Sequence, residues 1–367
     1  MIDLRKLRKI RTFGNSMYPL MKNEDVIHYR PIEFKKISVG DIVVVQKDSV
    51  FITHRVIYKN STTHITKGDN NLKPDQPFGE KDIVGKVYMI QRGRKKVKIE
   101  ELYLLQSSIY YKEICRLNDE LHKARVKFVF LKGLPLHLYY ERSYPRRVYA
   151  DCDILINKKE KNKIEKIIGK FGYKKLYEGP IKVDRAKNLS TEINYFKVVN
   201  GIQVVFDIHF APAFMMTKLN INQRFYDPVL LDSLTAHFLQ NKRKIRIEHN
   251  QFTILQPVEL VAYLALHFFH HNYRDMFRLQ LIKEILQKDF SASNWNKLGK
   301  LIIKYKLQNF IFPVFILLQD YYEVRIPSSF LVTIYPRGFL SAILLRRVKN
   351  SIFISQKKLQ RIKKVLS

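Results

Sequence analysis

One stretch, residues 146–156, constrains the fold of this chain more than any other. It ends in an apolar, β-prone run that predicts a buried strand, yet it carries Asp151 and Asp153 two residues apart. Because residues i and i+2 of a strand point to the same face, both carboxylates should project together. Two such charges repel unless a cation lies between them, and Mg²⁺ prefers carboxylate and phosphate oxygens. The stretch predicts a magnesium clamp for phosphoryl chemistry, and the alternative is a strand end with two solvated aspartates.

Two neighbouring stretches favour the clamp. Residues 129–131 form a short apolar run that leads into Lys132-Gly133 and then into a helix-like segment. At such a strand, glycine turn and helix start, free backbone N–H groups and the helix dipole favour a phosphate. Residues 201–210 form a further apolar strand that carries a third carboxylate, Asp207.

This order of pieces resembles the nucleotidyltransferase domain of the polymerase-β-like superfamily, and more closely the bacterial family of uncharacterised nucleotidyltransferases. The resemblance covers roughly residues 101–310 and includes a later helix over 260–286. The matching pieces are the Leu131-Lys132-Gly133 turn, Arg147 ahead of Asp151 and Asp153, the step at 171–173, and Asp207-Ile208-His209.

The resemblance implies a role for each matching residue. Asp151 and Asp153 would bind Mg²⁺, and Asp207 would bind a second metal or act as the base. Lys132, Gly133 and Arg147 would contact the nucleoside triphosphate. We expect Asp153→Asn to weaken Mg²⁺-dependent nucleotide binding and to stabilise the metal-free fold, because it relieves repulsion among clustered carboxylates.

Residues 1–99 form a separate unit with a different pattern. Short apolar runs at 43–45, 50–52, 56–58, 64–66 and 83–90 alternate with Gly, Asn, Asp and Pro turns, which predicts an all-β domain. Four motifs then follow in order, at residues 14–19, 39–43, 53–56 and 66–71. They resemble the type I signal peptidase family in the form whose base is histidine, and the match runs to residue 87.

In that family Ser16 would be the nucleophile and His54 the base. Independently of the family, a neutral histidine near pH 7 can take the proton from a serine hydroxyl, and a carboxylate can hold the imidazole in the required tautomer. Asp69 and Asp75 are both candidates for the carboxylate, and Asp69 lies in the better-matched motif. The Ser16 backbone N–H is the simplest oxyanion donor. Because only a short basic start precedes Ser16, we expect a dedicated peptide as substrate rather than translocated preproteins.

Composition adds an unusual charge. The net charge is +33, spread over the whole chain, which favours polyanionic partners such as nucleic acid, nucleotides or anionic lipid; lysine-rich codon usage is the alternative. Two cysteines are too few for a disulfide framework. The sequence shows no transmembrane run and no signal peptide. We expect a cytoplasmic protein. The basic segments at 1–10 and 340–366 are able to contact the inner face of the membrane, and the slightly favoured alternative for 340–366 is a solvated helix face over a core.

The sequence therefore predicts a multidomain, bifunctional protein. A signal-peptidase-like serine peptidase spans residues 1–99, an α/β (α+β) nucleotidyltransferase core spans 100–256, and a helical C-terminal extension spans 257–367. Its partners would be a nucleoside triphosphate and a peptide that it processes and modifies. The alternative function is a non-catalytic basic module, built from degenerate enzyme domains, that binds nucleic acid or membrane.

Overall fold

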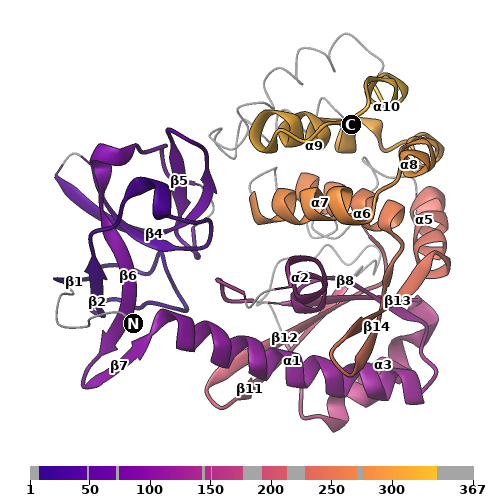
Figure 1. Ribbon diagram of the computed structural model, residues 1–367. Coiled ribbons are helices and arrows are strands. Elements are labelled where there is room, and N and C mark those ends of the chain that lie inside the picture. The colour runs from indigo at the N-terminus through magenta and orange to yellow at the C-terminus, as the bar shows by residue number, and fades with distance from the viewer. Residues whose placement is uncertain are drawn as a thin grey trace, which may run out of the picture. The chain divides into compact units, whose positions relative to one another are not determined.

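A computed structural model describes residues 8–47, 49–71, 74–142, 145–149, 151–176, 192–212, 228–270 and 276–336. These residues form two compact units (Figure 1). The first comprises the chain to Ser107 together with Tyr144–Val148, and the second comprises most of the remainder. The boundaries expected at residues 99 and 256 remain proposals. Within the described part of the chain, no helix combines the length and apolar composition needed to span a lipid bilayer.

The first unit is an antiparallel sheet, as the alternating pattern and frequent turns predict. Its strands pair in the order β1-β2-β6-β3-β4-β5, and β7 pairs with β6. The runs expected separately at 50–52 and 56–58 belong to one strand, because no turn residue divides them. The strands are β1 (Arg8–Arg11), β2 (Val26–Arg30), β3 (Ile42–Lys47), β4 (Val50–Lys59), β5 (His64–Lys67), β6 (Ile83–Arg92) and β7 (Lys95–Lys98).

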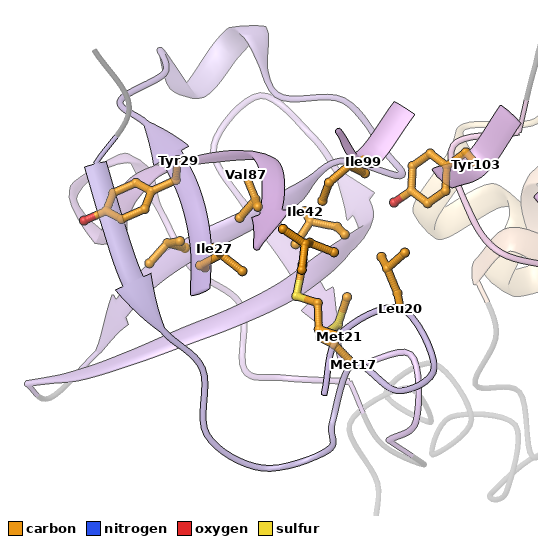
Figure 2. Close-up of a cluster of buried hydrophobic side chains, with 11 residues drawn as sticks. Met17, Leu20, Met21, Ile27, Tyr29, Ile42, Val87, Ile99 and Tyr103 are labelled. Atoms are coloured by element: carbon orange, nitrogen blue, oxygen red, sulfur yellow. The ribbon is translucent and has the colours of Figure 1, made fainter. Parts of the chain in front are cut away.

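A buried apolar cluster anchors the segment around Ser16 to this sheet (Figure 2). Met17, Leu20 and Met21 are each less than 10% exposed and pack with residues of β2, β3, β6 and the start of α1 (Ile99–Lys123). Full burial of such a side chain stabilises the fold by about 1.5–3 kcal/mol. The residue that follows Ser16 is thus fixed in the core, which holds the serine backbone in place.

The second unit is a mixed α/β structure whose sheet has the strand order β10-β11-β12-β9-β8-β14-β13. Within it β12 runs parallel to β9 and β14 runs parallel to β8, whereas the other pairs are antiparallel. The strands are β8 (Phe128–Lys132), β9 (Cys152–Ile156), β10 (Lys174–Lys175), β11 (Glu192–Val199), β12 (Ile202–His209), β13 (Lys242–Ile247) and β14 (Asn250–Leu255). β11 and β12 form a hairpin around Asn200-Gly201, a dipeptide that favours two-residue hairpin turns.

Helices lie between the strands of the second unit, and the described chain after β14 is mostly helical. Beyond α1 they are α2 (Leu134–Glu141), α3 (Lys161–Lys170), α5 (Pro228–Gln240), α6 (Pro257–His270), α7 (Met276–Lys288), α8 (Ala292–Lys304), α9 (Gln308–Tyr322) and α10 (Ser328–Thr333). The single helix expected over 260–286 is described as two, α6 and α7. Residues 1–7 and 337–367, which hold most of the basic segments assigned to membrane contact, lie outside the described residues.

A buried histidine in the first unit carries a pH dependence. His64 is 1% exposed, and its ring lies 3.9 Å from that of Phe34 and 5.7 Å from that of Phe78. Neither ring nitrogen has a hydrogen-bond partner among the described residues. Burial, helped by the charge of Lys59, lowers the pKa of His64 to about 4. The folded state therefore holds a neutral imidazole where the unfolded chain binds a proton.

We predict that the first unit loses about 2 kcal/mol of stability between pH 7 and pH 4.5, because the unfolded state alone binds the His64 proton over most of that range. His64→Phe should abolish this loss, whereas the exposed His249→Gln should not change it. Hydrogen exchange of β3, β4 and β5 in the full-length protein, followed by mass spectrometry at both pH values, measures the effect. An undiminished loss in His64→Phe would contradict it.

Candidate functional site

A single cross-strand row places four polar side chains together in the second unit. Asn194 of β11 lies opposite Asp207 of β12, Asp207 pairs with Asp153 of β9, and Asp153 pairs with Lys132 of β8. Side chains at directly paired positions project from the same face of a sheet. The row therefore gathers two of the predicted carboxylates and the predicted lysine on four adjacent strands.

A bulge brings Lys132 into this row. The register between β8 and β9 shifts between Phe130 and Lys132, so Leu131 is the extra residue. Without the shift, Lys132 would pair with Cys152 and point to the opposite face. The next residue, Gly133, has φ +102°, a backbone conformation that L side chains rarely adopt. The turn into α2 therefore requires glycine.

The lysine lies between the two aspartates of the D-x-D pair. Its Nζ is 2.9 Å from Oδ2 of Asp151 and 2.5 Å from Oδ2 of Asp153, and its side chain is 12% exposed. Burial alone would lower the pKa of Lys132, but the charges of Asp151 and Asp153 raise it above its ordinary value. Lys132, expected to contact a phosphate, neutralises both carboxylates in this structure.

His209 holds the other oxygen of Asp153. Its Nε2 donates to Oδ1 of Asp153 at 2.7 Å, and its Nδ1 faces Oε2 of Glu192 at 3.5 Å. Burial would lower the pKa of His209, but the hydrogen bond and charge of Asp153, with Glu192 and Asp207, raise it. Burial would likewise raise the pKa of Asp153, but Lys132 and His209 outweigh that effect and lower it.

Asp207 differs from Asp153 in its partners and in the direction of its pKa shift. One oxygen, Oδ1, accepts from Nδ2 of Asn194 at 2.5 Å, and no cation forms an ion pair with Asp207 among the described residues. Burial, followed by the charges of Asp153 and Asp151, raises the pKa of Asp207 to about 7. The repulsion among the three carboxylates therefore falls on Asp207.

The expectation that Asp153→Asn stabilises the metal-free fold is wrong on this geometry. Asp153 is paired with Lys132 and His209, so the substitution would remove the partner of two buried cations. The carboxylate whose neutralisation relieves repulsion is Asp207.

The carboxylates fit a divalent cation. Asp153, Asp207 and His209 each offer one ligand atom within 4.8 Å of the others. Two of the three donors are carboxylates, the ligands that Mg²⁺ prefers, and Asp151 adjoins them through Lys132. The carboxylates are therefore the candidate metal ligands, and His209 fixes one oxygen of Asp153.

Two helices border the site. Tyr263 of α6 is fully buried, and burial and the charge of Asp153 raise its pKa well above its ordinary value, whereas the charge of Arg278 acts to lower it. Arg278 of α7 donates from Nε to Nδ1 of His267 at 2.8 Å. Arg147, predicted to contact the nucleotide, is grouped with residues 145–148 in the first unit.

A second constellation occurs in the first unit, where the structure brings Ser16 and His54 together. The His54 Nε2 lies 2.9 Å from Oγ of Ser16, and its Nδ1 lies 2.6 Å from Oδ2 of Asp75. The Asp75 Oδ2 also accepts from Oγ1 of Thr66 at 2.7 Å. The three side chains have the order of contacts of a Ser-His-Asp triad.

Asp69, expected from its motif to be the third member, does not contact His54; Asp75 does. Both oxygens of Asp69 accept from Arg55, at 2.7 Å from Nε and 2.6 Å from Nη2. Arg55 is 1% exposed and also donates to the carbonyl oxygens of Gly40 and Arg146. Asp69 thus neutralises a buried guanidinium, and Asp75 contacts the imidazole.

The loop after Asp69 supports the serine backbone. The backbone N–H of Asn70 donates to the carbonyl oxygen of Ser16 at 2.8 Å. A Cβ on Gly68 would lie 2.6 Å from the same oxygen, so only glycine fits there. The Ser16 N–H makes no hydrogen bond within the described residues, which leaves it available as the oxyanion donor expected from the sequence.

One protein family matches this chain, over the end of the first unit and most of the second. A family model described as "Uncharacterised nucleotidyltransferase" matches residues 98–323. A crystal structure described as an antigenic nucleotidyltransferase-like protein from Paracoccidioides brasiliensis matches with a TM-score of 0.32 and 12% identity, over 63% of this chain and 95% of that chain. Similarity at that level carries no argument about fold or function. No curated protein matches the chain.

We predict opposite changes in stability for the two buried aspartates in metal-free protein at pH 8. Asp207→Asn should raise the free energy of unfolding by about 1 kcal/mol, because the amide keeps the acceptor for Asn194 and loses the repelled charge. Asp153→Asn should lower it by about 3 kcal/mol, because Lys132 and His209 lose their shared partner. Thermal unfolding in EDTA, with hydrogen exchange of β9 and β12 to localise the change, measures both against the exposed control Asp232→Asn.

The gain in Asp207→Asn should shrink as the pH falls from 8 to 4. Folded Asp207 takes up a proton near pH 7, whereas an unfolded aspartate stays ionised to about pH 4. The Asp207 carboxylate therefore lowers stability fully above pH 7 and progressively less below it. Equal effects of the two substitutions, or a gain independent of pH, would contradict this charge distribution.

Proposed function

Because the chain belongs to the uncharacterised nucleotidyltransferase family, we propose that its second unit transfers a nucleotidyl group from a nucleoside triphosphate to an acceptor hydroxyl, with Mg²⁺ as cofactor. The observation that carries the proposal is the row formed by Asn194, Asp207, Asp153 and Lys132 on four adjacent strands. Three carboxylates in a largely buried site repel one another, and this repulsion lowers the stability of the metal-free protein. A cluster with a purely structural role would have no reason to retain that repulsion.

Each side chain has a definite task in this proposal. Asp151, Asp153 and Asp207 would hold Mg²⁺, which when bound supplies positive charge to the phosphates. His209 fixes Oδ1 of Asp153 and so orients the carboxylate. Asn194 fixes Oδ1 of Asp207, which leaves Oδ2 to accept the proton of the acceptor hydroxyl or to serve as a second metal ligand. The positive charges of Lys132 and Arg278 suit the triphosphate.

We predict that Asp207→Asn abolishes nucleotidyl transfer while the protein stays folded. The loss should be at least about 10³-fold, because the neutral amide can neither accept the hydroxyl proton nor bind Mg²⁺ as a carboxylate does. Incubation with each α-³²P-labelled nucleoside triphosphate and a peptide library, followed by electrophoresis and mass spectrometry, detects the transferred mass. Asp232→Asn is the matched control. Transfer that survives in Asp207→Asn would refute the role of this site.

A second function is favoured by a specific observation in the first unit, namely the contacts of Ser16, His54 and Asp75. His54 can accept the Ser16 proton at Nε2 while Asp75 stabilises the imidazolium through Nδ1, so that Oγ attacks a peptide carbonyl. The N–H of Ser16 would stabilise the oxyanion. This unit is then a serine peptidase resembling type I signal peptidases, and a peptide that it cleaves is the natural acceptor for the second unit. Peripheral membrane contact remains a proposal from the basic terminal segments.

We predict that a fluorophosphonate probe labels Ser16 in the wild-type protein. Ser16→Ala should abolish labelling, and Asp75→Asn should slow it by about 10⁴-fold, because the imidazole loses the carboxylate that holds its tautomer. Asp69→Asn should lower the free energy of unfolding, because Arg55 would lose a charged partner in the core. It should change the labelling rate of the folded protein far less than Asp75→Asn does. Mass spectrometry of the labelled peptide measures the rates. Slower labelling in Asp69→Asn than in Asp75→Asn would reverse the assignment.

A further inference from the structure

Lys132 lies where a cation between Asp151 and Asp153 would lie. Its ammonium contacts one oxygen of each aspartate, at 2.9 Å and 2.5 Å. The other oxygen of Asp153 is taken by His209. A divalent cation that uses Oδ2 of Asp153 must therefore replace the Lys132 ammonium, because two cations sharing that oxygen would repel strongly at such short range.

The chain around Lys132 permits such a replacement. Its backbone is fixed by pairing with Asp153 and by the turn at Gly133, whose φ of +102° requires glycine. Its side chain, in contrast, has four rotatable methylene groups and a compact charge at the end. The ammonium can leave the carboxylates while β8 stays in place.

A displaced ammonium needs a new anionic partner. Removing the partner of a buried ion is strongly destabilising, so a metal ion that entered alone would strand Lys132. A triphosphate supplies anionic oxygens that can accept the ammonium as it leaves the aspartates.

We propose that Lys132 makes metal binding conditional on the nucleotide, so that the site takes up a divalent cation only together with a triphosphate. Lys132 keeps free metal out by occupying Asp151 and Asp153, and it passes to the phosphates when the metal–triphosphate complex arrives. It is a specificity-determining residue for the nucleotidyl transfer on which this inference rests. Its function is to select the complex over free metal.

The test is the affinity for free Mn²⁺, followed by electron paramagnetic resonance without nucleotide. Lys132→Met should bind Mn²⁺ more tightly than the wild type by about tenfold or more, because the competing charge is gone. Lys132→Gln, which keeps a polar group, should behave in the same way, and Lys132→Arg, which keeps the charge, should stay weak. The exposed Lys166→Met is the matched control and should equal the wild type. Hydrogen exchange of β8 and β9 verifies the fold of each variant.

The second readout is the affinity for Mn²⁺ in the presence of an equimolar mixture of α,β-methylene analogues of the four ribonucleoside triphosphates. The analogues should tighten Mn²⁺ binding to the wild type and tighten it less in Lys132→Met, because coupling between two ligands is lost with the residue that links them. Equal affinity of wild type and Lys132→Met for free Mn²⁺ overturns the inference and leaves the proposed function standing. Absence of Mn²⁺ binding in every protein, with or without analogues, overturns both.

Discussion

Electrostatic repulsion among Asp151, Asp153 and Asp207 is the constraint on which the second unit depends. Asp153 lies on β9, Asp151 lies just before β9, and Asp207 lies on the neighbouring strand β12. Three carboxylates this close cannot all stay ionised in a largely buried site without compensating cations. The chain meets this requirement with local devices: a bulge turns Lys132 toward the aspartates, and the alternation of β12 places His209 beside Asp153. Among the residues that the structure describes, Asp207 receives only a neutral amide, and its raised pKa marks where the compensation is incomplete.

The first unit solves a related problem with a different arrangement. Arg55 is buried one residue after His54, and Asp69 neutralises it with two hydrogen bonds. Asp75, reached by the return of the chain past Thr66, faces the imidazole. Two aspartates six residues apart therefore have separate tasks, one structural and one beside the catalytic histidine. This division allows the serine site to contain a strong ion pair without losing the carboxylate that its histidine needs.

The sequence predicted the parts of this architecture that follow from local rules. Strand alternation placed Asp151 and Asp153 on one face, and the order of the motifs in the first unit brought Ser16 to His54. The same alternation rule applied to Asp207 would have pointed to His209, which was noted only as part of a motif. The roles of Asn194 and Glu192 depend on cross-strand register, which a single strand's sequence does not encode. The bulge at Leu131 has no sequence signal at all, so the pairing of Lys132 with the aspartates could not be foreseen. Asp69 was favoured because of its motif, but the charge of its neighbour Arg55 decided its contacts.

The central claim is that the row of Asn194, Asp207, Asp153 and Lys132 in the second unit is a site for a metal–triphosphate complex. The most direct measurement is a crystal structure with Mn²⁺ and an α,β-methylene nucleotide, in which anomalous scattering locates the metal. The account predicts an anomalous peak coordinated by oxygens of Asp153 and Asp207, with the Lys132 ammonium moved from Asp153 to a phosphate oxygen. A nucleotide bound elsewhere, with Lys132 still bridging Asp151 and Asp153, would contradict it.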